Sequence, residues 1–209
     1  MIESKNQNFN HLKIHSQYSI CEGAIKIDDL KDFSKDKKIK SLGLSDTSNL
    51  CGALEFAEKI SKIGTQPIIG TQINFKFNDI IGLLPLYALN DIGYKRIIEL
   101  SSMSFLNNNQ LSEPQLDFNE LLTNNNGIAV FSGTIFGLFG ELFNKGKFQN
   151  INELYSKLKF SYGDRFYIEI QRHEDENELG FEKFNRSKSL ELEIPLIATN
   201  EVFYLNKEM

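Results

Sequence analysis

Two of the three histidines in this 209-residue chain, His11 and His15, lie in the short stretch HLKIH, and Lys13 lies midway between them. The stretch alternates apolar and polar residues, as a half-buried strand does. Imidazole is a common ligand of divalent metal ions, whereas an ammonium group has no lone pair to offer a metal. The stretch therefore raises the question of metal chemistry and of why a lysine stands within it.

Other polar residues that could do chemistry follow strand-like stretches further along the chain. If those strands are parallel and close into a barrel, their carboxyl ends converge on one face, where sites are built. Histidine and carboxylate side chains suit Zn, Mn or Fe, and a bridging carboxylate could hold two ions for phosphoester hydrolysis. Helix caps and turn formers are the alternative role for such residues. The residues in question are His15, Asp46, Gln72, Ser132, Gln171, His173, Asn200 and Glu201.

The elements that must position these residues are short apolar runs rich in β-branched and aromatic side chains. Helical patterns of apolar residues separate most of these runs, at residues 25–34, 50–63, 92–105, 151–160 and 178–192. Strands that alternate with helices are typical of a parallel α/β fold. The strand candidates are HLKIH, SLGLS, PIIGTQINF, GLLPLYAL, GIAVFS, RFYIEIQ and PLIATN.

Seven strand candidates could form either an open sheet or a closed barrel. The chain has no GxGxxG after its first strand and no GxxxxGK[ST], so the common phosphate loops of open sheets find no support. The barrel is therefore favoured. Two Asn-rich stretches, 106–115 and 123–127, are expected to be loops within one domain that covers residues 1–209.

Composition limits the classes of function. The formal net charge is -5, and the densest basic run, residues 35–40, is interrupted by Asp36, so we expect the domain alone to bind DNA poorly. Cys21 and Cys51 match no zinc motif and are expected to be reduced thiols. Since no stretch approaches the roughly 20 apolar residues of a membrane span, and the start lacks a signal-peptide pattern, the cytoplasm is the expected location.

Several blocks of the sequence resemble one family in order. HLKIHSQYSICEGAIKIDDL, GLSDTSNLCGALEFAEK and QPIIGTQINF, followed by LYALNDIGYKRIIELSS, GIAVFSG, RFYIEIQRH and PLIATNEVFYLNKEM, resemble the polymerase and histidinol phosphatase (PHP) domain. The version they resemble stands at the N-terminus of the bacterial replicative DNA polymerase III α subunit. The resemblance implies a distorted seven-stranded (β/α)7 barrel. It also implies that the 209 residues are the N-terminal fragment of a longer polymerase whose palm and fingers lie outside them.

The resemblance also implies a metal site that has decayed. Intact members carry HLHxH in the first block and TDHGN in the second, followed by a glutamate, a cysteine or histidine, and a histidine in later blocks. By this mapping the retained ligands are His15, Asp46, His173 and Glu201. The substituted positions are Lys13, Thr47, Gln72, Thr134 and Phe203. His11 aligns with the outer position of the first block and is expected to be structural.

These substitutions should remove a multinuclear hydrolytic site, so we expect no catalytic residue and no bound metal. Lys13 is interpreted as a replacement cation whose ammonium pairs with Asp46 or Glu201. The resemblance then implies an inactive scaffold that supports the polymerase core and docks the proofreading exonuclease subunit in the replisome, within a parent enzyme that uses Mg²⁺ for DNA synthesis.

Two enzymatic alternatives remain. A residual phosphoesterase or 3'-5' exonuclease could use His15, Asp46, His173 and Glu201 around one Zn or Mn ion, because four ligands can hold a single zinc. A free-standing histidinol-phosphate phosphatase is the second alternative, although the later blocks resemble the polymerase version better.

Overall fold

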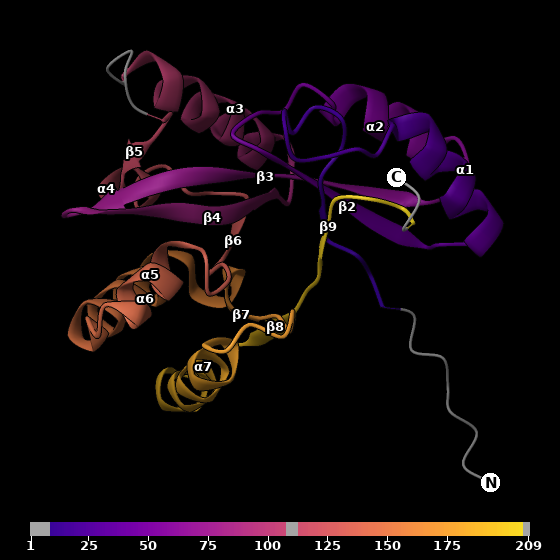
Figure 1. The fold of residues 1–209 in the computed structure, drawn as a ribbon. Coiled ribbons are helices and arrows are strands. Elements are labelled where there is room, and N and C mark those ends of the chain that lie inside the picture. The colour runs from indigo at the N-terminus through magenta and orange to yellow at the C-terminus, as the bar shows by residue number, and fades with distance from the viewer. Residues whose placement is uncertain (1–8, 108–112, 207–209) are drawn as a thin grey trace, which may run out of the picture.

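A computed structural model describes residues 9–107 and 113–206 of the chain. Figure 1 shows one long, strongly curved sheet with helices along its outer side. Every strand candidate of the sequence corresponds to a strand, and two further strands of two residues each, β5 and β9, were not anticipated. The strands of the described residues are β1 (Lys13–Ile14), β2 (Ser41–Thr47), β3 (Gln66–Phe77), β4 (Ile80–Ala88), β5 (Leu116–Asp117), β6 (Ile128–Phe131), β7 (Phe166–Ile170), β8 (Leu196–Ala198) and β9 (Glu201–Val202).

The five predicted helical segments are present, with boundaries that differ by a few residues. Two short helices, α4 and α5, and one 3-10 turn, η1, lacked a clear periodic pattern. The helices of the described residues are α1 (Ile27–Lys37), α2 (Ala53–Ser61), α3 (Asp91–Leu106), α4 (Phe118–Leu121), α5 (Leu138–Asn144), α6 (Phe148–Tyr162), η1 (Gly163–Arg165) and α7 (Glu178–Leu192). The 123–127 loop lies between α4 and β6, whereas residues 108–112 of the other predicted loop lie outside the described residues.

The sheet is mixed rather than wholly parallel, which corrects one prediction. Its strand order is β8-β7-β6-β4-β3-β2-β1-β9, with β5 beside β3, and β4 runs antiparallel to both β3 and β6. The stretches PIIGTQINF and GLLPLYAL have no helix between them, because Asn78 and Asp79 turn the chain directly from one strand into the next. Asn78 has a positive φ of 54°, a conformation that asparagine tolerates well in tight hairpin turns.

The sheet curls into a barrel-like form, and its two outermost strands are neighbours in the sequence. The strand order begins with β8 and ends with β9, and only Thr199 and Asn200 separate these two strands in the sequence. Contacts across the interior join β1 to β7 through Lys13 and Glu169, and Gln72, in the middle of β3, contacts His15 just after β1.

Alternation along the strands divides the apolar residues between the outside and the inside of this curl. Leu86 and Val130 belong to the large core under the helices, while their neighbours Tyr87 and Phe131 form a small separate cluster. The rings of Tyr87 and Phe131 lie 4.6 Å apart. Ala129 completes this inner cluster, and Leu12, Ile68, Tyr167 and Ile197 pack against it.

In the part of the chain that the structure describes, no helix is long and apolar enough to cross a membrane. Cys21 and Cys51 are both exposed free thiols.

Candidate functional site

The centre of the candidate site is a buried lysine. Lys13 is 1% exposed, and its neighbour Ile14 packs in the opposite direction, into the core under α1 and α2. The Lys13 ammonium lies 3.3 Å from Glu169 Oε1 and 3.4 Å from Glu201 Oε2. The predicted pairing with Glu201 is therefore present, and Glu169 on β7 is a second partner that the sequence had not indicated.

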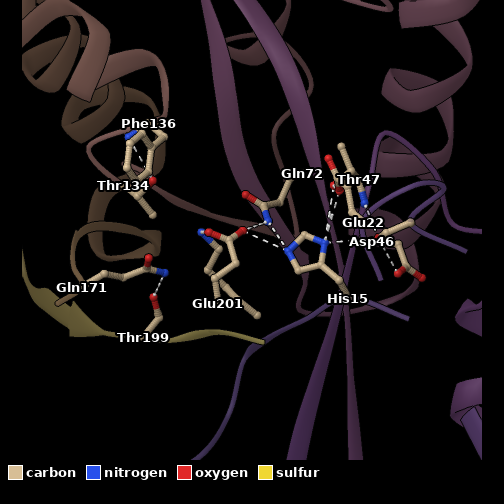
Figure 2. A network of polar contacts seen from close by, with 12 residues as sticks. His15, Glu22, Asp46, Thr47, Gln72, Thr134, Phe136, Gln171, Thr199 and Glu201 are labelled. Atoms are coloured by element: carbon tan, nitrogen blue, oxygen red, sulfur yellow. Dashed lines mark hydrogen bonds and ion pairs between the residues drawn. The ribbon is translucent and has the colours of Figure 1, made fainter. Parts of the chain in front are cut away.

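His15 lies two residues after Lys13 and connects Glu201 with Ser19, whose hydroxyl also contacts Asp46. Its Nε2 is 2.9 Å from Glu201 Oε1, and its Nδ1 is 3.1 Å from the Ser19 hydroxyl. Phe203 stacks on the imidazole with ring centroids 4.4 Å apart. Figure 2 shows Glu201 and Gln72 on one side of the His15 ring and Thr47, Glu22 and Asp46 on the other.

Glu201 is held as a carboxylate by its neighbours. Burial favours its neutral form, but the hydrogen bond from His15, the Lys13 charge and a 2.5 Å hydrogen bond from the Gln72 amide outweigh this effect. Together they lower the pKa of Glu201 from 4.5 to about 2. Gln72 thus stabilises a negative charge that a second carboxylate at this position would repel.

Asp46 is buried at the end of β2 and is already fully engaged by hydroxyl and amide donors. Its Oδ1 accepts hydrogen bonds from the Ser16 backbone N–H at 2.7 Å and the Ser19 hydroxyl at 2.8 Å. The Ser16 hydroxyl also lies 2.9 Å from Oδ2. Asp46 therefore anchors the loop after β1, and the His15 ring separates it from Glu201.

The loop of residues 16–24 is tightly folded, which places Glu22 at the rim of the site. A Cβ atom on Gly23 would come within 2.1 Å of the Ser16 carbonyl oxygen, so this close approach requires glycine. The backbone of Ala24 donates a hydrogen bond to the Phe203 carbonyl. The Glu22 carboxylate accepts a 2.6 Å hydrogen bond from the Thr47 hydroxyl.

The other side of the site is built around Glu169, whose side chain is fully buried. Its Oε1 accepts hydrogen bonds from Gln171 and from the Thr199 hydroxyl, in addition to the Lys13 ammonium. Its Oε2 has no hydrogen-bond partner within the described residues. His173 is exposed and contacts the Gln171 side-chain oxygen through Nε2 at 3.1 Å.

The remaining predicted residues serve local structure. Thr134 accepts a hydrogen bond from the Phe136 backbone N–H in the turn before α5, and the Ser132 hydroxyl accepts one from the Glu169 backbone N–H. His11 packs edge-on against Phe9, and its backbone carbonyl accepts the Gly43 N–H, consistent with a structural role. Burial lowers the pKa of His11.

A cavity of about 470 Å³ opens above these side chains. Its walls include Phe136, Phe203 and Tyr204 beside the polar groups of the site. The full lining is His15, Glu22, Thr47, Leu83, Phe136, Gln171, His173, Glu201, Phe203 and Tyr204. Asn200 lies outside it, in a separate cavity between β7, β8 and Phe9.

The four positions that the resemblance predicts as retained ligands each have other partners in this structure. Glu201 is occupied by Lys13, His15 and Gln72, Asp46 lies on the far side of the His15 ring, and His173 is turned toward Gln171. Within the described residues, no group of three or more His, Cys, Asp or Glu side chains is arranged to hold a metal ion. The Lys13 ammonium, which has no lone pair to offer a metal, is the group that pairs with Glu201 in this arrangement.

Solved structures of other proteins share this mixed, curled α/β architecture. One of them, named as a metal-dependent phosphoesterase from Bifidobacterium adolescentis, superimposes with a TM-score of 0.62 over 93% of this chain and 87% of its own, at 10% identity. An amidohydrolase from Chromobacterium violaceum superimposes with a TM-score of 0.61 over 96% of this chain and 89% of its own, at 9% identity. At such identities the likeness concerns the fold alone.

The PHP domain family matches residues 11–173, and the chain belongs to this family. Similar full-length relatives are the DNA polymerase III subunit alpha of Caulobacter vibrioides, 32% identical over 98% of this chain, and that of Rickettsia conorii, 35% identical over 96%. The chain spans only 18% and 17% of these two relatives, so it resembles one part of them.

Reasoning from the sequence missed two groups of residues that complete the site. Glu169 carries a charge inside the apolar run FYIEI, and a charge at that place in a buried strand was a signal available from the sequence. Ser16 and Ser19 hold Asp46 through a loop fold that residue types alone do not reveal.

Proposed function

We propose that this chain, over residues 1–209, is the PHP domain of a DNA polymerase III α subunit in which an internal lysine has replaced the metal centre. In this proposal the domain is a catalytically inactive scaffold for the polymerase core. The observation that carries the proposal is the Lys13 ammonium, buried between Glu169 and Glu201. A fixed cation there neutralises carboxylates that would otherwise require a metal ion.

The proposed context is the replisome in the cytoplasm. The relatives named as DNA polymerase III subunit alpha are about five to six times longer, which supports a role as one domain of a larger polymerase. The DNA synthesis itself and its Mg²⁺ ions would then belong to regions outside these 209 residues. We further propose that the domain docks the proofreading exonuclease subunit.

Metal analysis tests the central claim most directly. The tag-free chain is purified without chelators, incubated with zinc and manganese, desalted and analysed by mass spectrometry. The proposal expects a metal content far below one ion per chain. A content near one ion per chain, lost in the Asp46→Asn variant, would contradict it and favour the residual metal-dependent phosphoesterase or 3'-5' exonuclease.

Activity assays are a second test that distinguishes an inactive scaffold from a metal-dependent phosphoesterase or exonuclease. We expect no hydrolysis of a phosphomonoester or of single-stranded DNA above background, with or without added zinc or manganese. Hydrolysis that requires metal and disappears in Asp46→Asn would assign the site to an enzyme.

The docking role needs its own experiment. The chain and the proofreading exonuclease subunit of the same organism are mixed at micromolar concentrations and separated by gel filtration. Co-elution is the expected outcome, and elution as two independent peaks would contradict the docking role without affecting the claim about the metal site.

A further inference from the structure

The cavity above the Lys13 site combines acidic groups with exposed aromatic rings. Phe136 is 65% exposed and Tyr204 is 57% exposed, although both belong to the lining of a cavity. The Glu22 side chain is 42% exposed at the rim. The volume of about 470 Å³ falls in the range of roughly 300–1,000 Å³ that is typical of small-ligand pockets.

The charge of the site is the opposite of what a phosphoester requires. A chain of hydrogen bonds and ion pairs connects the carboxylates of Asp46, Glu169 and Glu201, and Lys13 is the one ammonium within this connected set of described residues. Glu22 adds a further carboxylate 3.8 Å from His15. An anionic ligand would meet repulsion here, whereas a cation would be attracted.

The two arginines that line the separate cavity beside Asn200 do not offset this negative charge, because both are already paired. Arg172 makes two 2.8 Å hydrogen bonds to the Glu182 carboxylate, and Arg186 lies 3.5 Å from the same carboxylate. Lys13 itself is buried beneath Glu201 rather than part of the cavity lining. The charged side chains of the cavity lining are the carboxylates of Glu22 and Glu201, and they lie beside three aromatic rings, two imidazoles and the polar side chains of Thr47 and Gln171.

These observations together point to a specific ligand chemistry. We infer that the cavity accepts an arginine side chain from a partner protein, with the guanidinium near Glu22 and Glu201 and its flat face against Phe136, Phe203 or Tyr204. A guanidinium is planar, stacks on aromatic rings and forms paired hydrogen bonds with a carboxylate, which suits it to this combination better than an ammonium. This inference rests on the proposed loss of the metal site and adds the partner group that uses the cavity.

The position of the rings supports the inference independently of the charges. The Phe203 and Tyr204 ring centroids are 6.2 Å apart at an angle of 50°, and the Phe203 ring is fixed by its stacking on His15. Figure 2 shows Phe136 across the open space from His15 and Glu22. A flat cation could therefore contact aromatic groups on two sides of the cavity while facing the carboxylates.

The test uses the whole 209-residue chain and a defined probe. The peptide acetyl-Gly-Arg-Gly-amide is titrated into ¹⁵N-labelled protein, and amide shifts are followed by NMR. We expect saturable shifts at residues 203 and 204 and around His173. The matched peptide with citrulline, which keeps the shape but has no charge, should bind about tenfold more weakly, because hydrogen bonds to charged groups are the stronger kind.

Two variants and two matched controls locate the site. Phe136→Ala and Glu22→Gln should each weaken binding by about two- to fivefold, as expected for the loss of one cation–π contact or one exposed charge partner. Phe160→Ala and Asp164→Asn remove a ring and a carboxylate that are even more exposed and lie outside the cavity lining, and they should leave binding unchanged. A thermal melt of each variant confirms that it is folded.

Three outcomes would overturn the inference. They are the absence of saturable shifts, equal binding of the arginine and citrulline peptides, and tighter binding of thymidine monophosphate than of the arginine peptide at the same amides. The metal analysis distinguishes a failure of this inference from a failure of the proposed function. If no metal is bound and arginine does not bind, this inference alone fails, whereas a stoichiometric metal in the cavity contradicts the proposed function as well.

Discussion

Two lysines of this domain each bridge two carboxylates, and their surroundings differ almost completely. Lys59 lies 2.8 Å from Asp28 and 2.7 Å from Glu55 on the outer surface of α1 and α2, where all three side chains are at least 30% exposed. Lys13 lies 3.3 and 3.4 Å from its two carboxylates inside the barrel, where it is 1% exposed. The surface pair has the shorter distances.

Distance alone is therefore a poor guide to how much each lysine matters. At the surface, water and salt can replace the partner of any charge, so such pairs contribute little to stability. In the interior, the ions have lost their hydration, and removal of one partner leaves the others buried without compensation. The comparison indicates that the two buried carboxylates require Lys13, whereas Asp28 and Glu55 do not require Lys59.

The largest expected effect is that of Lys13→Met, which keeps the length of the side chain and removes its charge. Because Glu169 and Glu201 would lose their shared cation, we expect the free energy of unfolding to fall by about 3–5 kcal/mol. Urea unfolding followed by circular dichroism measures the change. A loss below about 1 kcal/mol would show that Lys13 does not have the role assigned to it.

Acid should weaken the same network through Glu201. Its folded-state pKa of about 2 lies below its ordinary value of 4.5, so its contribution to stability is present above pH 4.5 and is lost as the pH falls toward 2. The contribution is on the order of 3 kcal/mol. Unfolding free energies measured between pH 6 and pH 2.5 should fall more steeply for the original chain than for Glu201→Gln. Parallel curves for the two proteins would contradict the assignment.

A double-mutant cycle between Lys13→Met and Glu169→Gln should reveal direct coupling. Lys13→Met leaves Glu169 and Glu201 without their shared ammonium, and Glu169→Gln leaves Lys13 with Glu201 alone, whereas the double change removes one ammonium and one carboxylate together. We expect the double variant to be about 1–3 kcal/mol more stable than the sum of the single effects predicts. Additive effects would mean that the 3.3 Å contact between Lys13 and Glu169 contributes nothing to stability.

The sequence predicted the strands of this fold better than their directions. Each strand candidate carried its own apolar run, so its existence depended on local pattern. The antiparallel course of β4 instead depends on Asn78 and Asp79, two residues that turn the chain without a helix. The short helices α4 and α5 contain only four and seven residues, too few for a periodic pattern to stand out.

The site shows the same division between local pattern and tertiary structure. The resemblance named Lys13 and Glu201 as members of one site, and the structure brings them within 3.4 Å of one another. The resemblance also placed His173 and Asp46 in a common ligand set. In the structure, Asp46 is held by the loop after β1, whereas the His173 ring contacts the Gln171 side chain. Which oxygen faces which donor depends on how the barrel curls, and the order of residues does not specify that.

The smallest expected effect is that of Lys59→Met, the surface counterpart of the first variant. We expect a loss of at most about 1 kcal/mol, because its carboxylate partners remain hydrated when the ammonium is removed. The difference between this variant and the original chain should shrink further when the salt concentration rises from 0.05 to 1 M, since salt screens exposed charges. The effect of Lys13→Met should change much less over the same range. A surface variant as damaging as the buried one would mean that burial is not what separates the two lysines, and the requirement for a cation inside the barrel would lose its physical basis.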